Sequence, residues 1–398
     1  MHILIIPSEH YVTWKAPLGA LFQHHQAHAL NKRKGIKVGV VSAGFVPFKM
    51  LFSAYPYPPF EVDDGVNTYR CYKRILVPGR IANKVFLKYL VGLYLNLFER
   101  YINEQGIPDI IHAHNCLYAG ATALRIKGKY SIPYLITEHS SAYARDMISV
   151  RQAALIRDVL KNAAIKTAVS TKLGGLMENL FSTDASPIYP IFNILDNRFE
   201  KKGNILKGAK EDRDIFIFLN IASLNANKNQ FDLLEAFARV FGANSKVQLK
   251  IGGDGPLRRK LETQAKELGL GEQVVFTGLL SRDRVLPEML NCDVFVLSSI
   301  FETFGVVLIE ALACGKPVIA TKCGGPEDIV NPINGLIVPT KDINALADAM
   351  SKIYSAIDKY DTNRIRNDCL SRFGEDAFVK RLQNIYIDIL SKEKGRKN

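Results

Sequence analysis

The sequence lacks the cysteine pairs that mark a disulfide framework or a structural zinc site. Its six cysteines are scattered through 398 residues, with no Cys-x-x-Cys pair and no histidine at zinc-finger spacing. No low-complexity tract or short-period repeat appears either. The pattern excludes a disulfide-stapled or zinc-finger protein and indicates a reducing compartment, so we expect a cytoplasmic location.

Long apolar runs are also missing. The longest, residues 89–98, has about half the length of a membrane-spanning helix, and Asn96 interrupts it. The opening residues, MHILIIPSEH, have the pattern of a strand, with no basic segment and no cleavage site. We therefore expect neither a membrane span nor a secretory leader.

The charge is unevenly distributed along the chain. The net charge is +13, and residues 1–195 hold 22 Lys and Arg against 12 Asp and Glu, whereas the remainder holds 30 against 27. A basic half attracts nucleic acid, phosphorylated substrates or an anionic membrane surface. No nucleic-acid-binding motif or aromatic-interleaved basic helix is present, so we expect no nucleic-acid partner.

The length and the apolar pattern predict two α/β domains. A chain of 398 residues with 47% apolar residues exceeds the usual size of one domain. In the first half, buried strands are predicted at residues 3–6, 38–42, 109–112 and 134–137, with helices at residues 18–34 and 81–104. The second half repeats the alternation of strand and helix, which is typical of a parallel sheet.

Two glutamates lie in the most informative stretch of the second half. A buried strand is predicted at residues 292–298 and a helix at residues 306–313, with Glu302 in the loop between them and Glu310 within the helix. In open α/β sheets, ligands bind outside the carboxyl ends of the strands, which is where Glu302 is expected.

This arrangement fits a ligand with hydroxyl groups at two points and a phosphate between them. Glu302 and Glu310 can each accept hydrogen bonds from vicinal hydroxyls, and amides at Phe304 and Gly305 offer an anion site at the helix N-terminus. A nucleotide sugar has this chemistry. The alternative is a solvated loop glutamate and a helix glutamate that merely favours the helix dipole.

The same residues resemble a known motif. Glu302 and Glu310, with Phe304-Gly305 and Gly315-x-Pro317 around them, resemble the EX7E motif of the retaining glycosyltransferases of family GT4. Further segments fit that family: Gly253-Asp254-Gly255-Pro256, Gly324-Gly325-Pro326-Glu327 and Asn334-Gly335-Leu336. The resemblance is strong over residues 186–345 and weaker but continuous before them.

The resemblance implies a GT-B fold, with two Rossmann-like domains facing each other across a cleft. Residues 1–192 are then the acceptor-side domain and residues 193–373 the nucleotide-sugar-binding domain. Residues 374–398 form a C-terminal helix that crosses back to the first domain.

The resemblance also implies roles for individual residues. Glu302 binds the donor sugar and His139, in Thr137-Glu138-His139, lines the donor-sugar pocket; these two are the predicted catalytic residues. The predicted donor-binding residues are Gly19 in a phosphate-binding turn, Lys228 on the diphosphate, Leu280 beside the nucleobase, Phe304 and Gly305 through their amides, and Glu310 on the ribose.

Some residues depart from the family pattern or invite other interpretations. Ser223 stands where the family has an arginine that clamps the diphosphate, and Gly19 stands alone where the family has a glycine pair. His139 has a buried structural histidine as its alternative, and His112-x-His114 resembles a pattern that is mainly structural. His24 and His28 have metal-binding spacing on one helix, but no third ligand follows them, so we expect a surface or acceptor-facing role.

The predicted function is transfer, with retention, of a sugar from a UDP- or GDP-linked donor to a glycan or lipid-linked acceptor in cell-surface polysaccharide or glycoconjugate synthesis. No metal or other cofactor is expected. The alternatives are a nucleotide-sugar epimerase of similar shape and an inactive partner subunit. The basic first half, with the aromatic helix at residues 81–104, predicts a peripheral association with the inner face of the plasma membrane.

Overall fold

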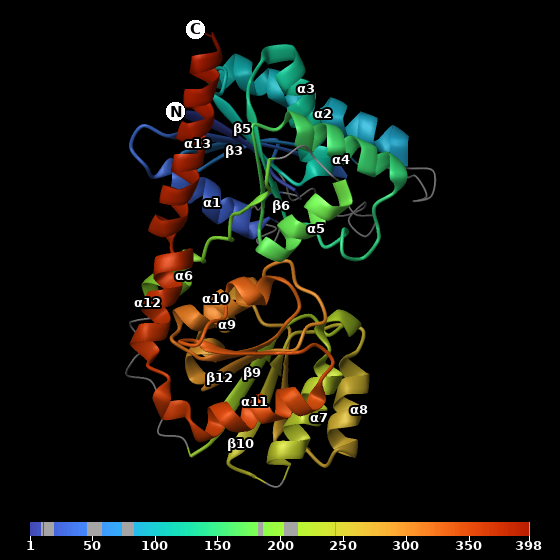
Figure 1. Cartoon of the computed structure of the whole chain (residues 1–398), viewed down its shortest axis with the longest axis vertical. Coiled ribbons are helices and arrows are strands. Elements are labelled where there is room, and N and C mark those ends of the chain that lie inside the picture. The colour runs from blue at the N-terminus through green and yellow to red at the C-terminus, as the bar shows by residue number, and fades with distance from the viewer. Residues whose placement is uncertain are drawn as a thin grey trace. The chain divides into compact units, whose positions relative to one another are not determined.

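The chain divides into two compact units. The computed structural model describes residues 1–8, 11, 20–45, 58–73, 83–181, 186–202, 214–242 and 244–397. Met1–Ile194 together with Phe378–Asn398 form the first unit, and Leu195–Ala377 form the second. Each unit is a parallel sheet covered by helices (Figure 1). The sequence analysis placed the domain boundaries after residues 192 and 373.

The sheet of the first unit has the strand order β3-β4-β2-β1-β5-β6-β7-β8. Among the described strands of this sheet, only β3 pairs in the antiparallel direction, with β4, through a tight turn at Asp64 and Gly65, both of which have positive φ. Its strands are β1 (His2–Ile6), β2 (Lys37–Phe45), β3 (Phe60–Asp63), β4 (Val66–Lys73), β5 (Ile110–His114), β6 (Tyr134–Glu138), β7 (Ile165–Ala168) and β8 (Tyr189–Pro190).

Helices cover both faces of this sheet. One face packs α1 and α13 against residues of β1, β2, β5 and β6 (Figure 1). The helices are α1 (Leu21–Asn31), α2 (Asn83–Gln105), the short π-helix η2 (Cys116–Gly120), α3 (Ala121–Tyr130), α4 (Val150–Asn162), α5 (Thr171–Phe181) and α13 (Glu375–Lys397). Within the described residues, no helix combines the length and the hydropathy that a membrane span requires.

The sheet of the second unit is wholly parallel in the order β11-β10-β9-β12-β13-β14. This is the order of the doubly wound dinucleotide-binding fold, in which the chain changes direction between the first strand, β9, and β12. The strands are β9 (Phe216–Ile221), β10 (Val247–Gly252), β11 (Val274–Gly278), β12 (Val294–Leu297), β13 (Val318–Thr321) and β14 (Gly335–Val338).

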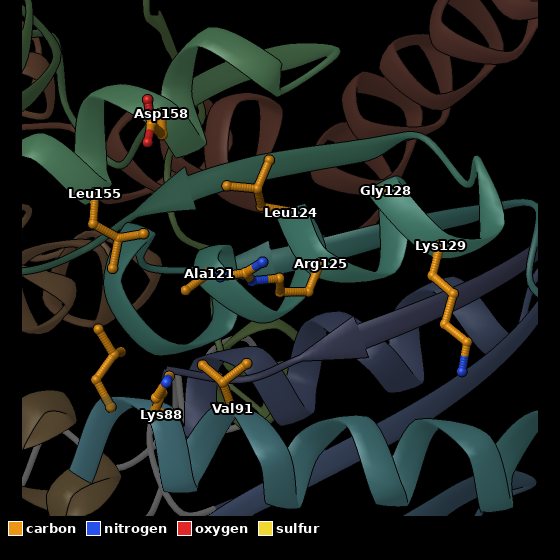
Figure 2. A pocket seen from close by; sticks show the side chains of 10 residues that line it. Lys88, Val91, Ala121, Leu124, Arg125, Gly128, Lys129, Leu155 and Asp158 are labelled. Carbon is orange, nitrogen blue, oxygen red and sulfur yellow. The ribbon is translucent and has the colours of Figure 1, made fainter. Parts of the chain in front are cut away.

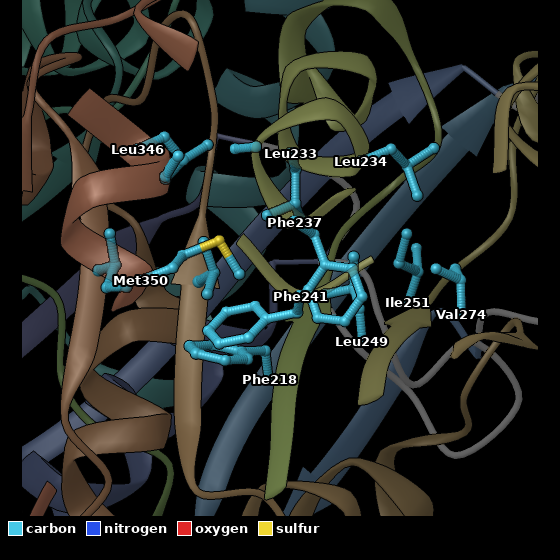
Figure 3. Packing of buried hydrophobic residues seen from close by; sticks show 14 of the residues in the cluster. Phe218, Leu233, Leu234, Phe237, Phe241, Leu249, Ile251, Val274, Leu346 and Met350 are labelled. Atoms are coloured by element: carbon cyan, nitrogen blue, oxygen red, sulfur yellow. The ribbon is translucent and has the colours of Figure 1, made fainter. Parts of the chain in front are cut away.

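The core of the second unit is packed with aromatic and branched side chains. Figure 3 shows Phe218 of β9 with Phe237 and Phe241 of α7, and Met350 of α11 beside them. The helices are α6 (Asn197–Lys202), α7 (Gln230–Phe241), α8 (Arg258–Glu267), α9 (Arg282–Asn291), α10 (Val306–Ala313), α11 (Ile343–Ser355) and α12 (Thr362–Phe373), with 3-10 turns η3 (Ala226–Lys228), η4 (Gly325–Asp328) and η5 (Ile357–Lys359).

The predicted fold class is confirmed: both units are Rossmann-like α/β domains. The predicted helix at residues 306–313 is α10, and the predicted strands of both halves lie within one to three residues of their observed bounds. Of the predicted helix at residues 18–34, the structure describes α1, while Gly19 lies outside the described residues.

The C-terminal helix belongs to the core of the first unit. Phe378, Val379, Leu382, Tyr386 and Ile389 of α13 are buried in one hydrophobic cluster with β1 and α1. Their i, i+4 and i, i+7 spacing places them on one face of the helix. The last residues of the chain therefore complete a domain that begins at the N-terminus.

This packing predicts that Leu382→Ala destabilises the first unit. Leu382 is fully buried, and removing a buried leucine side chain typically lowers the free energy of unfolding by about 2–5 kcal/mol. Hydrogen exchange of the β1 and β5 amides during a urea titration measures the free energy of unfolding of the first unit separately from that of the second. The exposed Lys380→Ala in the same helix serves as control, and equal protection in both variants would contradict the role of α13.

Candidate active site

The turn into α10 positions the predicted donor-binding residues of the second unit. Gly305, the residue before the helix, has φ of 98°, a conformation that glycine adopts without strain. Glu302 is partly buried in the preceding loop, and Glu310 is almost completely buried within α10. The ring of Phe304 is buried against Phe373, with 5.8 Å between ring centroids, so only its backbone is placed to meet a ligand.

A glycine pair holds the Glu302 loop in place. The amide of Glu302 donates to the carbonyl of Cys323 at 3.0 Å, and the amide of Gly325 donates to the carbonyl of Glu302 at 2.9 Å. A Cβ atom on Gly325 would lie 2.2 Å from the Cα of Phe304, and one on Gly324 would lie 2.5 Å from the Glu302 carbonyl oxygen. The Gly324-Gly325 segment is therefore required for this close approach of two backbones.

The loop after β9 brings Lys228 to Glu302. The hydroxyl of Ser298 donates to the carbonyl of Lys228 at 2.8 Å, and the amide of Ile300 donates to the carbonyl of Asn227 at 2.7 Å. The Lys228 ammonium then lies 2.5 Å from Oε1 of Glu302, which also accepts from the Ser299 hydroxyl at 2.7 Å. The structure brings together these two predicted residues, one assigned to the diphosphate and the other to the donor sugar.

Ser223 lies in the same loop as Lys228, and Leu280 lies in the loop that follows β11. The side chain of Ser223 is exposed, and its carbonyl accepts from the Gln230 side chain at 3.3 Å. Leu280 is half-buried beyond β11 and packs beside Gly252, where a Cβ atom would lie 2.7 Å from its Cδ1. Both loops follow the carboxyl ends of strands, as does that of Glu302.

Glu310 is engaged by an arginine that the sequence did not identify. Arg282, the first residue of α9, places Nη1 3.0 Å from Oε1 of Glu310, and its other terminal nitrogen pairs with Asp196. Arg198 also pairs with Asp196, at 3.0 Å. Burial raises the pKa of Glu310, and the contact with Arg282 opposes that rise. No motif in the sequence marks Arg282 as the partner of Glu310.

In the first unit, His139 follows β6 and contacts a second histidine. Its Nε2 lies 2.9 Å from Nδ1 of His114 at the end of β5, and its ring lies 4.8 Å from that of Phe22 between centroids. Burial lowers the pKa of His139 to about 3. The imidazole is therefore neutral at physiological pH.

A chain of buried contacts extends from His139 to the C-terminal helix. The ring of His114 stacks on that of His112 with 4.2 Å between centroids. His112 then bonds the Thr137 hydroxyl at 2.7 Å and the Tyr386 hydroxyl of α13 at 2.8 Å. His112, which the sequence analysis considered mainly structural, links α13 to the neighbours of His139, whereas His114 contacts His139 itself.

Glu138 holds the loop that carries His139. Its buried carboxylate accepts from the amides of His139 at 2.8 Å, Ser140 at 2.9 Å and Cys116 at 2.9 Å, and from the Tyr143 hydroxyl at 2.7 Å. Glu138 and His114 also line a cavity of about 160 Å³ next to this loop. Sequence reasoning treated Glu138 as a spacer between Thr137 and His139, because a burial-dependent role leaves no local signature.

Comparisons with known proteins identify the family. The sequence profile of the family described as Glycosyltransferase Family 4 matches residues 24–198, and that of the Glycosyl transferases group 1 matches residues 202–367. The chain belongs to the family 4 glycosyltransferases. It is therefore a glycosyltransferase, and its GT-B fold follows from the two Rossmann-like units and the family.

Similar proteins extend over nearly the whole of this glycosyltransferase. An uncharacterized glycosyltransferase of Methanocaldococcus jannaschii is 25% identical over 94% of this chain and 96% of its own. A putative teichuronic acid biosynthesis glycosyltransferase of Bacillus subtilis is 28% identical over 88% and 89%. Among solved structures, Anabaena HepE in complex with UDP has a TM-score of 0.70 at 19% identity, covering 98% of this chain and 100% of its own.

The hydrogen bonds of Glu138 predict a large loss of stability in Glu138→Ala. Three donors lose their acceptor and the His139 amide keeps only Asn115. Breaking a buried charged network typically lowers the free energy of unfolding by about 3–5 kcal/mol. Denaturant titration with hydrogen exchange at β6 measures this loss. Glu99→Ala is the matched control in the same unit, because Glu99 is exposed and makes a surface pair with Lys129. Similar losses in both variants would show that the network contributes nothing.

Proposed function

We propose that this glycosyltransferase transfers a sugar, with retention of anomeric configuration, from a nucleotide-diphosphate sugar to a glycan or lipid-linked acceptor. The observation that carries the proposal is the contact between Lys228 and Glu302 at the carboxyl ends of β9 and β12. A cation and a carboxylate at this switch point suit a ligand that has a diphosphate next to sugar hydroxyls.

Each residue has a proposed role in this reaction. Lys228 and the backbone amides before α10 stabilise the negative charge that grows on the leaving diphosphate. Glu302 accepts hydrogen bonds from the donor sugar, with one oxygen held by Lys228 and Ser299. Glu310 accepts from the ribose hydroxyls, because Arg282 contacts only one of its oxygens. His139 supplies a neutral imidazole, in line with its lowered pKa.

Retention follows from a same-face transfer in this proposal. The leaving phosphate takes the proton of the acceptor hydroxyl while that hydroxyl attacks the anomeric carbon from the same face. No metal or other cofactor has a role in these steps. A UDP- or GDP-linked donor is proposed, and HepE, whose structures contain UDP and UDP-glucose, supports the uridine nucleotide. Polysaccharide synthesis is supported by the teichuronic acid relative.

The ribose role predicts that Glu310→Ala weakens nucleotide binding. Loss of charge-assisted hydrogen bonds typically changes the binding free energy by about 1–3 kcal/mol, or roughly 5- to 150-fold in Kd. Calorimetric titration with UDP and GDP measures the change in Kd. Because Arg282 loses its contact with residue 310 in this variant, an unfolding curve checks that the variant is still folded. Glu267→Ala, at an exposed glutamate of α8, is the control. Unchanged affinity in a folded Glu310→Ala would rule out the ribose role.

A lipid-linked acceptor lies in a membrane. We therefore also propose that the first unit binds an anionic membrane surface. A groove of about 920 Å³ lies between α2, α3 and α4 (Figure 2). Its floor is apolar, with Leu87, Val91, Leu124 and Leu155, and its rim carries the exposed cations Lys88 and Arg125. Apolar contact flanked by positive charge is the chemistry that binds proteins to the surface of an anionic bilayer.

Membrane association predicts salt-sensitive binding to vesicles. The protein should co-sediment with anionic liposomes at low salt and dissociate by about 0.5 M salt, as screening shortens the reach of the charges. Replacing Lys88 and Arg125 together by alanine should weaken the free energy of binding to anionic vesicles by about 2 kcal/mol, which lowers the affinity roughly 30-fold. The exposed pair Lys260 and Lys266 of α8 gives a charge-matched control. Equal binding to neutral and anionic vesicles, or none to either, would refute the proposal.

A further inference from the structure

Two histidines of α1 and an aspartate of the β3–β4 turn form a cluster apart from the donor-binding residues. His24 and His28 lie on one face of the helix, four residues apart, and Asp63 ends β3. Nε2 of His24 lies 2.8 Å from Oδ2 of Asp63, and Nε2 of His28 lies 3.3 Å from the same atom. The sequence offered no third ligand near the histidines, because Asp63 lies 35 residues beyond His28.

The hydrogen bonds of His28 direct its second ring nitrogen at acceptor atoms of Asp63. Its Nδ1 lies 2.9 Å from the carbonyl oxygen of His24, which only accepts, so Nδ1 carries a proton. In a neutral imidazole the other nitrogen, Nε2, then has a lone pair. This lone pair faces two further acceptors of Asp63, the carbonyl oxygen at 3.1 Å and Oδ2 at 3.3 Å. Three electron-rich atoms thus converge on one point.

His24 contributes to the same point. The two imidazole rings lie 3.9 Å apart between centroids, with 36° between their planes. The ligand atoms of the three residues all lie within 4.8 Å of one another. Arg70, on the neighbouring β4, pairs with Glu61 at 2.8 Å, so its positive charge is compensated outside the cluster.

We propose that His24, His28 and Asp63 bind a divalent transition-metal ion, with zinc as the best fit. Two imidazole nitrogens and one carboxylate oxygen are a set that zinc accepts, with a water as fourth ligand. Bonds of about 2.0–2.2 Å place tetrahedral ligand atoms about 3.3–3.6 Å apart, and His28 Nε2 lies 3.3 Å from Asp63 Oδ2. His24 Nε2 lies 2.8 Å from the same oxygen, so it moves away from that oxygen when the ion binds. The Asp63 side chain is 42% exposed, so an ion reaches the site from solvent.

The proposed metal site connects the β3–β4 turn to α1. In addition to the cluster, Asn31 of α1 donates to the carbonyl of Asp64 at 3.2 Å. A metal ion held by α1 and β3 joins the two elements more firmly than hydrogen bonds do, and binding to the folded state alone stabilises it by linkage. The ion is thus proposed to stabilise α1, independently of the sugar-transfer reaction.

Direct binding tests the proposal on untagged, chelator-stripped full-length protein. Equilibrium dialysis against zinc, with elemental analysis, should give one bound equivalent, and cobalt(II) should give visible absorption bands of a low-symmetry site. Asp63→Asn and His28→Gln should each weaken zinc binding by at least about tenfold, because the loss of an outer-shell partner alone typically costs about 10- to 100-fold in metal affinity. His25→Gln, on the same helix but outside the cluster, should bind as the native protein does.

Thermal unfolding provides a second readout that does not depend on activity. Zinc should raise the Tm of the native protein and of His25→Gln, and leave that of Asp63→Asn unchanged. Equal zinc binding by Asp63→Asn and the native protein would overturn the proposal. So would an absence of both zinc and cobalt binding by the native protein. If either cluster variant fails to fold, the cobalt spectrum of the native protein decides.

Discussion

Parallel pairing of β9 with β12 is the constraint on which the candidate site in the second unit of this glycosyltransferase depends. Parallel strands end at one edge of the sheet, so the loops that follow β9 and β12 emerge side by side. Hydrogen bonds from Ser298 and Ile300 then fasten one loop to the other. The backbone arrangement therefore places Lys228 next to Glu302, and electrostatic attraction between the two side chains is not needed to bring the loops together.

Buried charges shape both units, and each is compensated within its own unit. Glu138 is surrounded by three amides and a hydroxyl, whereas Glu310 relies on Arg282, which is shared with Asp196. Desolvating such groups costs several kcal/mol unless hydrogen bonds or opposite charges replace the water. Networks of this kind stabilise a single arrangement of the loops, because any other arrangement leaves a buried charge without a partner. Loops that hold a ligand at the end of a sheet need such fixed positions.

The fold and part of the donor site followed from local patterns. Runs of buried aliphatic residues marked the strands, glycine marked the end and the beginning of α10, and the spacing of Glu302 and Glu310 placed one glutamate in a loop and the other in a helix. Lys228 and Glu302 are predicted to share one site only through the resemblance to the family pattern, because two residues 74 positions apart carry no local sign that they meet. Arg282 could not be assigned, since the first residue of a surface helix carries no pattern that reveals its partner.

The sequence alone determined the two α/β units, the EX7E-like segment and the residues that resemble a family pattern, because these depend on local spacing and on burial along short stretches. Only the tertiary structure decided which side chains meet. It placed His114 against His139, Arg282 between Glu310 and Asp196, and Asp63 beside His24 and His28. Each of these contacts joins residues more than 20 positions apart, and the position of a distant strand or helix is set by the packing of the whole core rather than by the residues themselves.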